Sequence, residues 1–341
     1  MCAARGMADD GAVVRTRTRT RTCWRTAWFA SGSLCCTLRP GRISWRGVSA
    51  MAWGLALSGG SVLGAAHLGV LRAFREWGLA PDVLAGASAG GLVAGVVAAG
   101  ARLEDVVRFG IEVGRRPLDY LRPRVVRLAA ELLPGDTLPP ADSLFDSAPL
   151  VRGLVALCPH PHRIEAWQVS TALTAVDLAS LEGVAFVGGF ATNALLPRGR
   201  WRVEVGGDLH VALQATMAMP GVFSPVRGPS VLLVDGGVAD DLPVDWAAAL
   251  GAARVVAVDV AASGPVLPPR AGIGWVLGRT ADYMTATLSR LRRPARFPVL
   301  TLLPDTAGIS GFAFGEFERL VELGYAAART RQGEIQAFVR G

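Results

Sequence analysis

Short apolar runs alternate with segments of helical periodicity from residue 53 onward. The first run ends in Ser58-Gly59-Gly60, as expected of a buried strand that stops at glycine. In the segment that follows, leucine and aromatic residues recur at helical spacing, and arginines occupy other positions on the helix. The predicted elements are, in order, a strand at 53–57, a helix at 64–77, a strand at 83–85 and a helix at 91–99. This order predicts a parallel sheet with helices on its faces.

The same patterns continue toward the carboxyl end, interrupted by one irregular region. Residues 102–165 contain many arginines and prolines, and we interpret them as helices and loops that form a cap over a site. Further apolar runs predict strands at 168–176, 185–191, 201–205, 231–234 and 255–260, and helices at 209–217 and 245–250. A helical segment at about 273–340, clearest over 314–339, closes the chain. We expect one α/β domain at 51–341, with its motifs at about 53–260.

Residues 1–50 differ from the rest of the chain in charge. They hold nine of the 35 basic residues and two of the 28 acidic ones, so the net charge of +7 belongs to them. A nucleic-acid-binding protein needs a basic face on its folded part, and none is indicated, so we expect no nucleic-acid partner. The segment is either an Arg-rich targeting sequence or the product of a start codon upstream of Met51. We favour the second reading, and expect residues 1–50 to be a disordered leader or a mis-assigned start.

Cysteine content and hydropathy indicate in which cellular compartment the protein is expected. Outside residues 1–50 the chain has only Cys158, so no internal disulfide can form there, and no Cys/His spacing matches a metal site. The 19 uncharged residues at 83–101 are long enough to suggest a membrane span. They contain five glycines and a strand–turn–helix pattern, so we predict no transmembrane helix. We expect a cytoplasmic protein whose only membrane contact is peripheral.

Gly86-Ala87-Ser88-Ala89-Gly90 is a G-x-S-x-G motif between a predicted strand and a predicted helix. In such motifs a nucleophilic serine stands on a sharp turn, and the strained turn leaves no room for large neighbours. All the neighbours of Ser88 in the motif are Gly or Ala. The helix N-terminus also stabilises negative charge that forms beside the serine. A chain with 41 glycines can contain the motif by chance, but the context favours Ser88 as a catalytic nucleophile.

A glycine-rich loop, Ser58 to Gly64, follows the first strand and opens the first helix. Its backbone N–H groups can form an oxyanion hole, because donors fixed before the reaction give the largest electrostatic stabilisation. The alternative is a dinucleotide-binding loop, with Asp82 as the acid about twenty residues further on. That motif needs glycine where Ser61 stands, and a dinucleotide-binding protein has no use for a nucleophilic turn on the next strand. We therefore favour the oxyanion hole.

Asp235-Gly236-Gly237 follows an apolar strand. Sites in α/β sheets gather at the carboxyl ends of strands, so we expect Asp235 at the same edge as Ser88, where it can accept the serine proton. The competing interpretation is a hairpin turn, in which Asp-Gly is common. An α/β-hydrolase has a histidine after its acid. The histidines, which all precede Asp235, are His67, His160, His162 and His210. A triad with Asp177 and His210 is the alternative to a simpler Ser–Asp pair.

Four segments together resemble the patatin-like phospholipase family, and they occur in the family's order. The segments are Ser58–Gly64 with His67–Leu71, Gly86–Gly90, Met217–Phe223 and Val234–Gly237. The resemblance implies a three-layer α/β/α fold with a mostly parallel central sheet, and a Ser–Asp dyad without metal or cofactor. The residues that it implies for the site are Ser88 as nucleophile, Asp235 as base, Gly59, Gly60 and Ser61 as oxyanion-hole donors, and Gly86, Gly90, Gly236 and Gly237 as motif glycines.

The function implied by the resemblance is that of a serine hydrolase that cleaves acyl esters of lipids, as phospholipases, lysophospholipases and lipases do. Ser61 departs from the family pattern, which has glycine there, and Leu63 departs from its arginine or lysine. A nearby cation would help to stabilise an oxyanion, so its absence puts the rate in doubt. Two alternatives are a catalytically impaired relative that binds lipid or protein, and an esterase for soluble esters. The expected partner is a lipid or other acyl-ester substrate, and the oligomeric state is unknown from the sequence.

Overall fold

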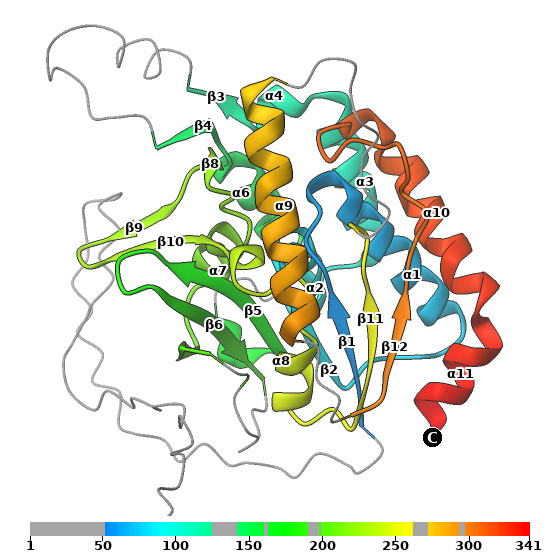
Figure 1. Ribbon diagram of the computed structural model, residues 1–341. Helices are drawn as coiled ribbons and strands as arrows, with labels where there is room; N and C mark the ends of the chain where they lie inside the picture. The colour runs from blue at the N-terminus through cyan, green and yellow to red at the C-terminus, as the bar shows by residue number, and fades with distance from the viewer. Residues whose placement is uncertain are drawn as a thin grey trace, which may run out of the picture.

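The computed structural model describes residues 52–124, 142–159, 163–189, 197, 199–261, 272–292 and 297–341. Helices and strands alternate along these residues much as the hydrophobic pattern predicts (Figure 1). The predicted leader at 1–50 lies outside the described residues, as do His160, His162 and part of the predicted cap.

Nine strands within the described residues form one central sheet. These strands are β1 (Trp53–Leu57), β2 (Val83–Gly86), β5 (Ser170–Asp177), β6 (Glu182–Gly188), β7 (Trp201–Val205), β9 (Val226–Gly228), β10 (Val231–Asp235), β11 (Arg254–Val258) and β12 (Val299–Leu302). Their order is β12, β11, β1, β2, β5, β10, β9, and β6 joins β5 to β7. Neighbours from β12 to β5 are parallel, as are β6 and β7, whereas β5 is antiparallel to β6 and β10, and β10 to β9. The sheet is therefore mostly parallel, as predicted.

Strand β5 brings the ends of two other strands together. Along one edge its first half pairs with β2 and its second half with β10. Gly86, at the end of β2, lies opposite Leu173, and Asp235, at the end of β10, lies opposite Ala175. Our expectation of a shared sheet edge assumed that the two strands run in the same direction. Strand β10 instead runs antiparallel to β5, so the two carboxyl ends meet head to head.

Helices cover both faces of the sheet, which gives the three α/β/α layers that the family resemblance implies. On one face lie α1 (Ala65–Glu76), α2 (Ser88–Ala98), α7 (Leu209–Thr216) and α10 (Phe317–Thr330). Helix α8 (Val244–Ala249) covers the other face, and Figure 1 shows α8 and α9 (Ile273–Arg292) in front of the sheet. Strand β1 contributes side chains to the hydrophobic cores on both faces of the sheet. Leu55 and Leu57 pack with α1 and α2, while Ala56 packs with α8 on the opposite face.

The remaining helices and strands of the described residues complete the fold. They are η1 (Ser61–Gly64), α3 (Leu103–Arg115), α4 (Pro117–Tyr120), β3 (Arg122–Pro123), β4 (Ser143–Asp146), α6 (Ala148–Ala156), η2 (Ile164–Ala166), β8 (Gly221–Phe223), η3 (Gly236–Val238), η4 (Phe314–Glu316) and α11 (Gln332–Arg340). Strands β3, β4 and β8 form a separate small sheet. The region interpreted as a cap thus contains helices, as predicted, and two short strands that are too brief to show a periodicity.

Helices α1 and α10 pack directly against each other because each has a glycine at the contact. A β-carbon on Gly69 would overlap the backbone of α10 at Val321, and one on Gly324 would overlap the carbonyl of Ala66. Leu68 of α1 and Leu320 of α10 are buried in the same core. The last part of the chain is therefore built into the core that the first helix forms.

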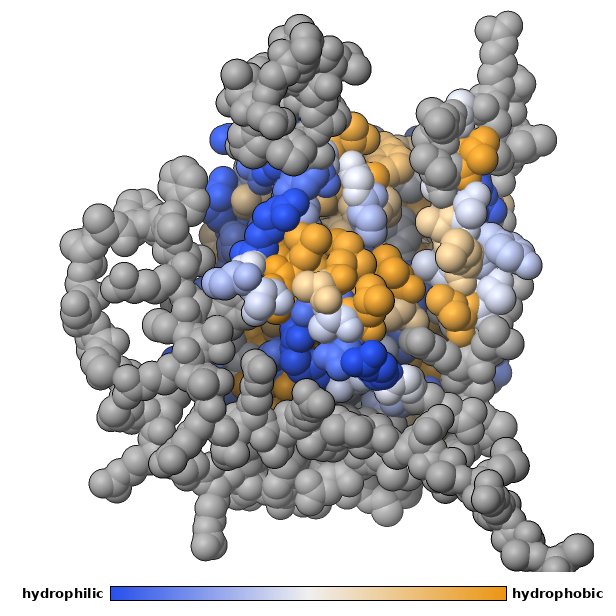
Figure 2. Space-filling model, turned by 60° about the vertical axis from the view of Figure 1, so that its left-hand side comes forward, coloured by the Kyte–Doolittle hydropathy of each residue, from blue (hydrophilic) through white to orange (hydrophobic). Residues whose placement is uncertain are grey.

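Surface hydrophobicity is unevenly distributed. Figure 2 shows apolar residues gathered at the centre of one face, with hydrophilic residues around them. A contiguous apolar patch of this kind is typical of a surface that contacts another molecule. Among the helices of the described residues, none combines the length and the apolar character needed to cross a bilayer.

Candidate active site

Ser88 stands at the junction between β2 and α2. Its φ of 52° lies in the left-handed region, which a residue with a β-carbon rarely adopts. Two glycines make the turn possible, since a β-carbon on Gly86 would overlap the backbone of Gly90, and one on Gly90 would overlap the backbone of Leu57. Strained backbone of this kind persists where surrounding contacts hold it, and such places are often functional sites.

Ser88 and Asp235 are hydrogen-bonded to each other although they lie 147 positions apart. Ser88 Oγ donates to Asp235 Oδ2 at 2.6 Å, a short distance typical of a hydroxyl bound to a carboxylate. The other carboxylate oxygen, Oδ1, accepts the amide of Gly237 at 2.7 Å. Asp235 is followed by the 3₁₀ helix η3, so the competing interpretation of a hairpin turn is wrong. The carboxylate is thus held with one oxygen directed at the serine hydroxyl.

The surroundings of Asp235 make it more basic than an ordinary aspartate. Burial raises its pKa to about 6 from the usual 3.8, because loss of water disfavours the charged form. The hydrogen bonds from Ser88 and Gly237 lower the pKa and so limit this shift. A carboxyl group that titrates close to neutral pH is well matched to accept a proton and to return it.

The glycine-rich loop passes beside the serine. A β-carbon on Gly59 would lie 3.1 Å from Cβ of Ser88, so glycine permits the close approach. The amide of Gly59 already donates to the carbonyl of Asp241 at 3.0 Å. The amides of Gly60 and Ser61, by contrast, have no acceptor in the part of the chain that the structure describes. Of the three predicted oxyanion donors, these two are therefore the available ones, and Gly59 anchors the loop.

Ser58 fixes the start of this loop against the turn that carries Ser88. Its carbonyl accepts the Nε2–H of His67 at 2.9 Å and the amide of Gly90 at 3.1 Å. Its hydroxyl accepts the amide of Val260 at 3.0 Å. Burial lowers the pKa of His67 to about 4, so the ring is neutral and acts as a hydrogen-bond donor within the core. His67 therefore has a structural role in the core.

The alternative triad is not assembled. Asp177 lies at the end of β5. Its carboxylate accepts hydrogen bonds from the side chains of Arg202 and Ser180 and from the backbone amides of Ala179 and Leu232. These bonds occupy both of its oxygens, and His210 is not among its partners in the described residues. Asp177 thus stabilises the β5–β6 turn and takes no part in a triad.

Two polar residues of the site escaped the sequence analysis. The hydroxyl of Thr216, at the end of α7, accepts the amide of Ser88 at 3.2 Å. A β-carbon on Gly237 would lie 3.1 Å from Asp235 Oδ1 and 2.9 Å from Asp241 Oδ1, so Asp241 is a second carboxylate beside the first. Thr216 directly precedes the Met217–Phe223 segment and Asp241 follows η3 closely, so nearness to a motif was the one available signal.

An apolar cavity of about 130 Å³ opens beside the serine. Its only polar side chains, within the described residues, are those of Ser61 and Ser88. Helix α3 contributes Val106, Phe109 and Val113 to the wall. Ligand pockets with a few polar groups in an apolar lining suit apolar substrates. The site therefore combines a serine hydroxyl bonded to a buried carboxylate, two backbone amides without an acceptor in the described residues, and a space for a hydrocarbon group.

Comparisons with known proteins agree with the motifs. A family model described as patatin-like phospholipase matches residues 55–248. An uncharacterised NTE family protein of Mycobacterium bovis is 30% identical over 221 residues, which cover 65% of this chain and 52% of that protein. Lysophospholipase NTE1 of Mycosarcoma maydis is 27% identical over 311 residues, or 83% of this chain and 15% of its own length. The chain thus spans about half, or less, of these curated relatives.

The solved structures that match share little sequence with this chain. VipD from Legionella pneumophila gives a TM-score of 0.42 at 14% identity, over 83% of this chain and 67% of its own. Human GIVD cytosolic phospholipase A2, in complex with a fluorophosphonate, gives a TM-score of 0.44 at 14% identity. The match covers 85% of this chain and 58% of that chain. The family match covers more than half of the chain, so the chain belongs to the patatin-like phospholipase family.

Proposed function

We propose that this protein is a serine hydrolase that cleaves acyl ester bonds of lipids, with Ser88 as nucleophile and Asp235 as general base. The observation that carries the proposal is the 2.6 Å hydrogen bond from Ser88 Oγ to Asp235 Oδ2 at a strained turn. Membership of the patatin-like phospholipase family supports the lipid as substrate. The apolar cavity beside Ser88 offers a place for the acyl chain.

Acylation of the serine starts with proton transfer. Asp235 takes the hydroxyl proton as Ser88 Oγ attacks the ester carbonyl carbon, because an adjacent base activates a weakly nucleophilic hydroxyl. The carbonyl oxygen becomes an oxyanion, and the amides of Gly60 and Ser61 are the groups that stabilise it. The intermediate then collapses, and its carbon–oxygen bond to the alcohol breaks. The departing alkoxide receives the proton from Asp235.

Deacylation repeats these steps with water. Asp235 removes a proton from a water molecule, whose oxygen attacks the acyl-serine carbonyl. The ester bond to Ser88 then breaks, Ser88 Oγ regains a proton from Asp235, and the fatty acid leaves. No metal or cofactor takes part in this sequence, and Asp235 is restored to the carboxylate at its end.

The test is hydrolysis of p-nitrophenyl butyrate by the full chain. Ser88→Ala and Asp235→Asn are each expected to lower kcat by a factor on the order of 1,000 or more, since they act as one unit. Ser180→Ala is the matched control, because Ser180 Oγ also donates to an aspartate, Asp177 Oδ2 at 3.1 Å, away from the site. Its activity should equal that of the unaltered protein. Full activity in Ser88→Ala or Asp235→Asn would contradict the dyad.

Covalent labelling separates the enzyme from a binding protein of the same family. A fluorophosphonate probe is expected to label Ser88, and the Ser88→Ala protein should remain unlabelled. An unaltered protein that stays unlabelled at saturating probe would favour the catalytically impaired relative. Equal turnover of butyrate and of lipid-like esters in solution, with none in vesicles, would favour an esterase for soluble substrates.

A further inference from the structure

One short segment separates the apolar cavity from the outside of the molecule. Val113 and Leu121 line the cavity and are buried, with 5% and 4% of their surface exposed. Between them in the sequence, Arg115, Arg116 and Leu118 point outward and are exposed. The end of α3, together with α4, is therefore a wall with an apolar inner side and a charged outer side, where Glu112 and Asp119 are exposed beside the two arginines.

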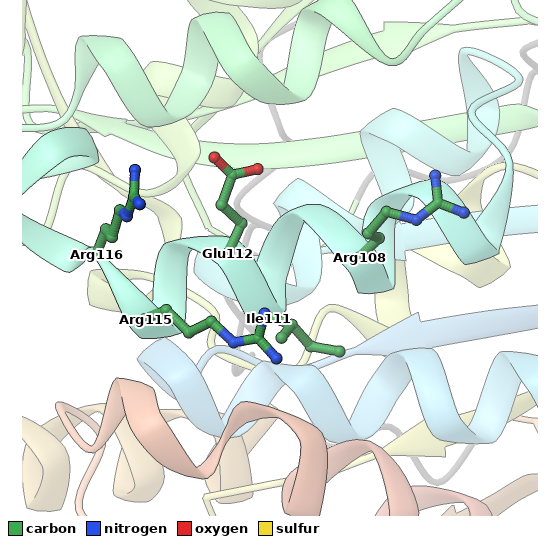
Figure 3. A pocket seen from close by; sticks show the side chains of 5 residues that line it. All are labelled: Arg108, Ile111, Glu112, Arg115 and Arg116. Carbon is green, nitrogen blue, oxygen red and sulfur yellow. The ribbon is translucent and has the colours of Figure 1, made fainter.

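The outer side of α3 is hollowed and carries arginines. Figure 3 shows the side chains around this hollow of about 480 Å³, which are Arg108, Ile111, Glu112, Arg115 and Arg116. Arg108 is paired with Asp105, and Glu112 accepts the hydroxyl of Tyr120. No carboxylate in the described part of the chain pairs with Arg115, Arg116 or the exposed Arg122 that follows α4. Positive charge is thus available at this place.

An apolar side chain stands among these arginines. Leu118 of α4 is 62% exposed, far more than a leucine usually is. Figure 1 places α4 and β3 at the end of the molecule toward which β1 and β12 point, and the turn with Ser88 follows β2 at that same end. Residues 108–122 hold four arginines against the carboxylates of Glu112 and Asp119, so the segment keeps a net positive charge around the exposed leucine. This combination suits a surface that is anionic at its headgroups and apolar beneath them.

We propose that the α3–α4 corner, residues 108–122, docks on a lipid surface that carries anionic headgroups. Arg115, Arg116 and Arg122 contact the phosphates, and Leu118 enters the layer beneath. The wall that the lipid surface touches is also a wall of the cavity, so a docked lipid lies next to the space for its acyl chain. Docking itself does not depend on the proposed hydrolysis; only the delivery of lipid to Ser88 rests on the proposed function.

The test measures flotation of the full chain with vesicles, which requires no turnover. One set of vesicles is phosphatidylcholine alone, and the other is equal parts phosphatidylcholine and phosphatidylglycerol. The protein is expected to bind the second set and to be released by salt, since counter-ions screen headgroup charge. Each basic residue near such a surface contributes about 5-fold in affinity, so Arg115→Gln with Arg116→Gln should weaken binding roughly 30-fold.

The matched control removes the same charge elsewhere. Arg329→Gln with Arg340→Gln alters two exposed arginines of α10 and α11, and binding should stay at the level of the unaltered protein. Leu118→Ser should also weaken binding, and this loss should persist at high salt. Thermal unfolding checks that every variant is folded.

Several results would overturn the docking surface. These are equal binding to both kinds of vesicle, equal weakening by the two double variants, or a Leu118→Ser protein that binds like the unaltered one. A protein that docks as described but hydrolyses no ester would contradict the proposed function and leave the docking surface in place.

Discussion

The hydroxyl of Thr216 accepts the backbone amide of Ser88 at 3.2 Å, and both groups are buried. Gly91 makes room for this contact, because a β-carbon there would overlap the Thr216 side chain. The bond joins the end of α7 to the turn that carries the nucleophile candidate. It is one of the contacts that hold Ser88 at its positive φ of 52°.

Thr216→Val should therefore harm the site although it keeps nearly the same volume. The change leaves the buried amide of Ser88 without an acceptor, which costs about 1–3 kcal/mol. We expect a lower free energy of unfolding and a lower kcat on p-nitrophenyl butyrate, with KM less affected. Thr216→Ser, which retains the hydroxyl, should recover most of the activity. Equal kcat in Thr216→Val and the unaltered protein would show that this bond does not position Ser88.

The pH dependence of hydrolysis should follow Asp235. A base must be deprotonated to act, and the pKa of this carboxyl group is raised to about 6 by burial. The ratio kcat/KM should thus rise with pH through about 6 and level off above it, whereas an ordinary aspartate would already give a plateau by about pH 5. Initial rates between about pH 5 and 8 measure this. A rate that is constant or falls over that range would contradict Asp235 as the base.

The cavity beside Ser88 should limit the length of the acyl chain. Its volume is about 130 Å³. An apolar cavity of about 150 Å³ accommodates a molecule of benzene, so the space here suits an acyl group of roughly six carbons. In a series of p-nitrophenyl esters, kcat/KM is expected to be highest near that length.

Phe109 offers a way to alter this preference. It lines the cavity, and its ring lies against Gly153 of α6. Phe109→Ala should move the preferred length toward longer chains, while Leu323→Ala, a change in α10 outside the cavity lining, should not. The same preference in both variants would contradict the assignment of the cavity to the acyl chain.

The contact between α1 and α10 should be essential to stability. Gly69→Val places a side chain where the backbone of α10 at Val321 lies, and no rotamer can avoid it. Overpacking of this kind typically costs about 1–3 kcal/mol and here involves backbone on both sides. Urea unfolding should give a clearly lower free energy. Gly78→Ala is the control: its β-carbon meets open space and its positive φ of 66° costs about 1 kcal/mol.

The sequence predicted most of the framework and the closeness of Ser88 and Asp235. The strand at 53–57 coincides with β1, and α1, β2, β7 and α7 lie within a residue or so of their predicted ends. Ser88 and Asp235 could be found because each carries a short motif at the end of an apolar run. Such short motifs can be recognised from one segment alone, without knowledge of how distant segments pair.

What the sequence did not reveal depends on pairing between distant segments. The sequence of β10 does not indicate its direction relative to β5, because a short apolar run is equally compatible with parallel and antiparallel pairing. The hydrogen bond from the Gly59 amide to the Asp241 carbonyl depends on the position of a loop some 180 residues further along the chain. Strand β12 has four residues, of which two are buried, and it is too short for a periodic pattern.

The close contact of α1 with α10 through Gly69 and Gly324 limits where the chain can be truncated. The family match ends at residue 248, yet Ala66 and Leu68 are covered by a helix that begins at Phe317. A truncated chain that stops where the recognisable motifs stop would expose that helical surface to water and to other chains. Expression trials guided by motif boundaries alone would then recover aggregates, even though every residue proposed for catalysis was present.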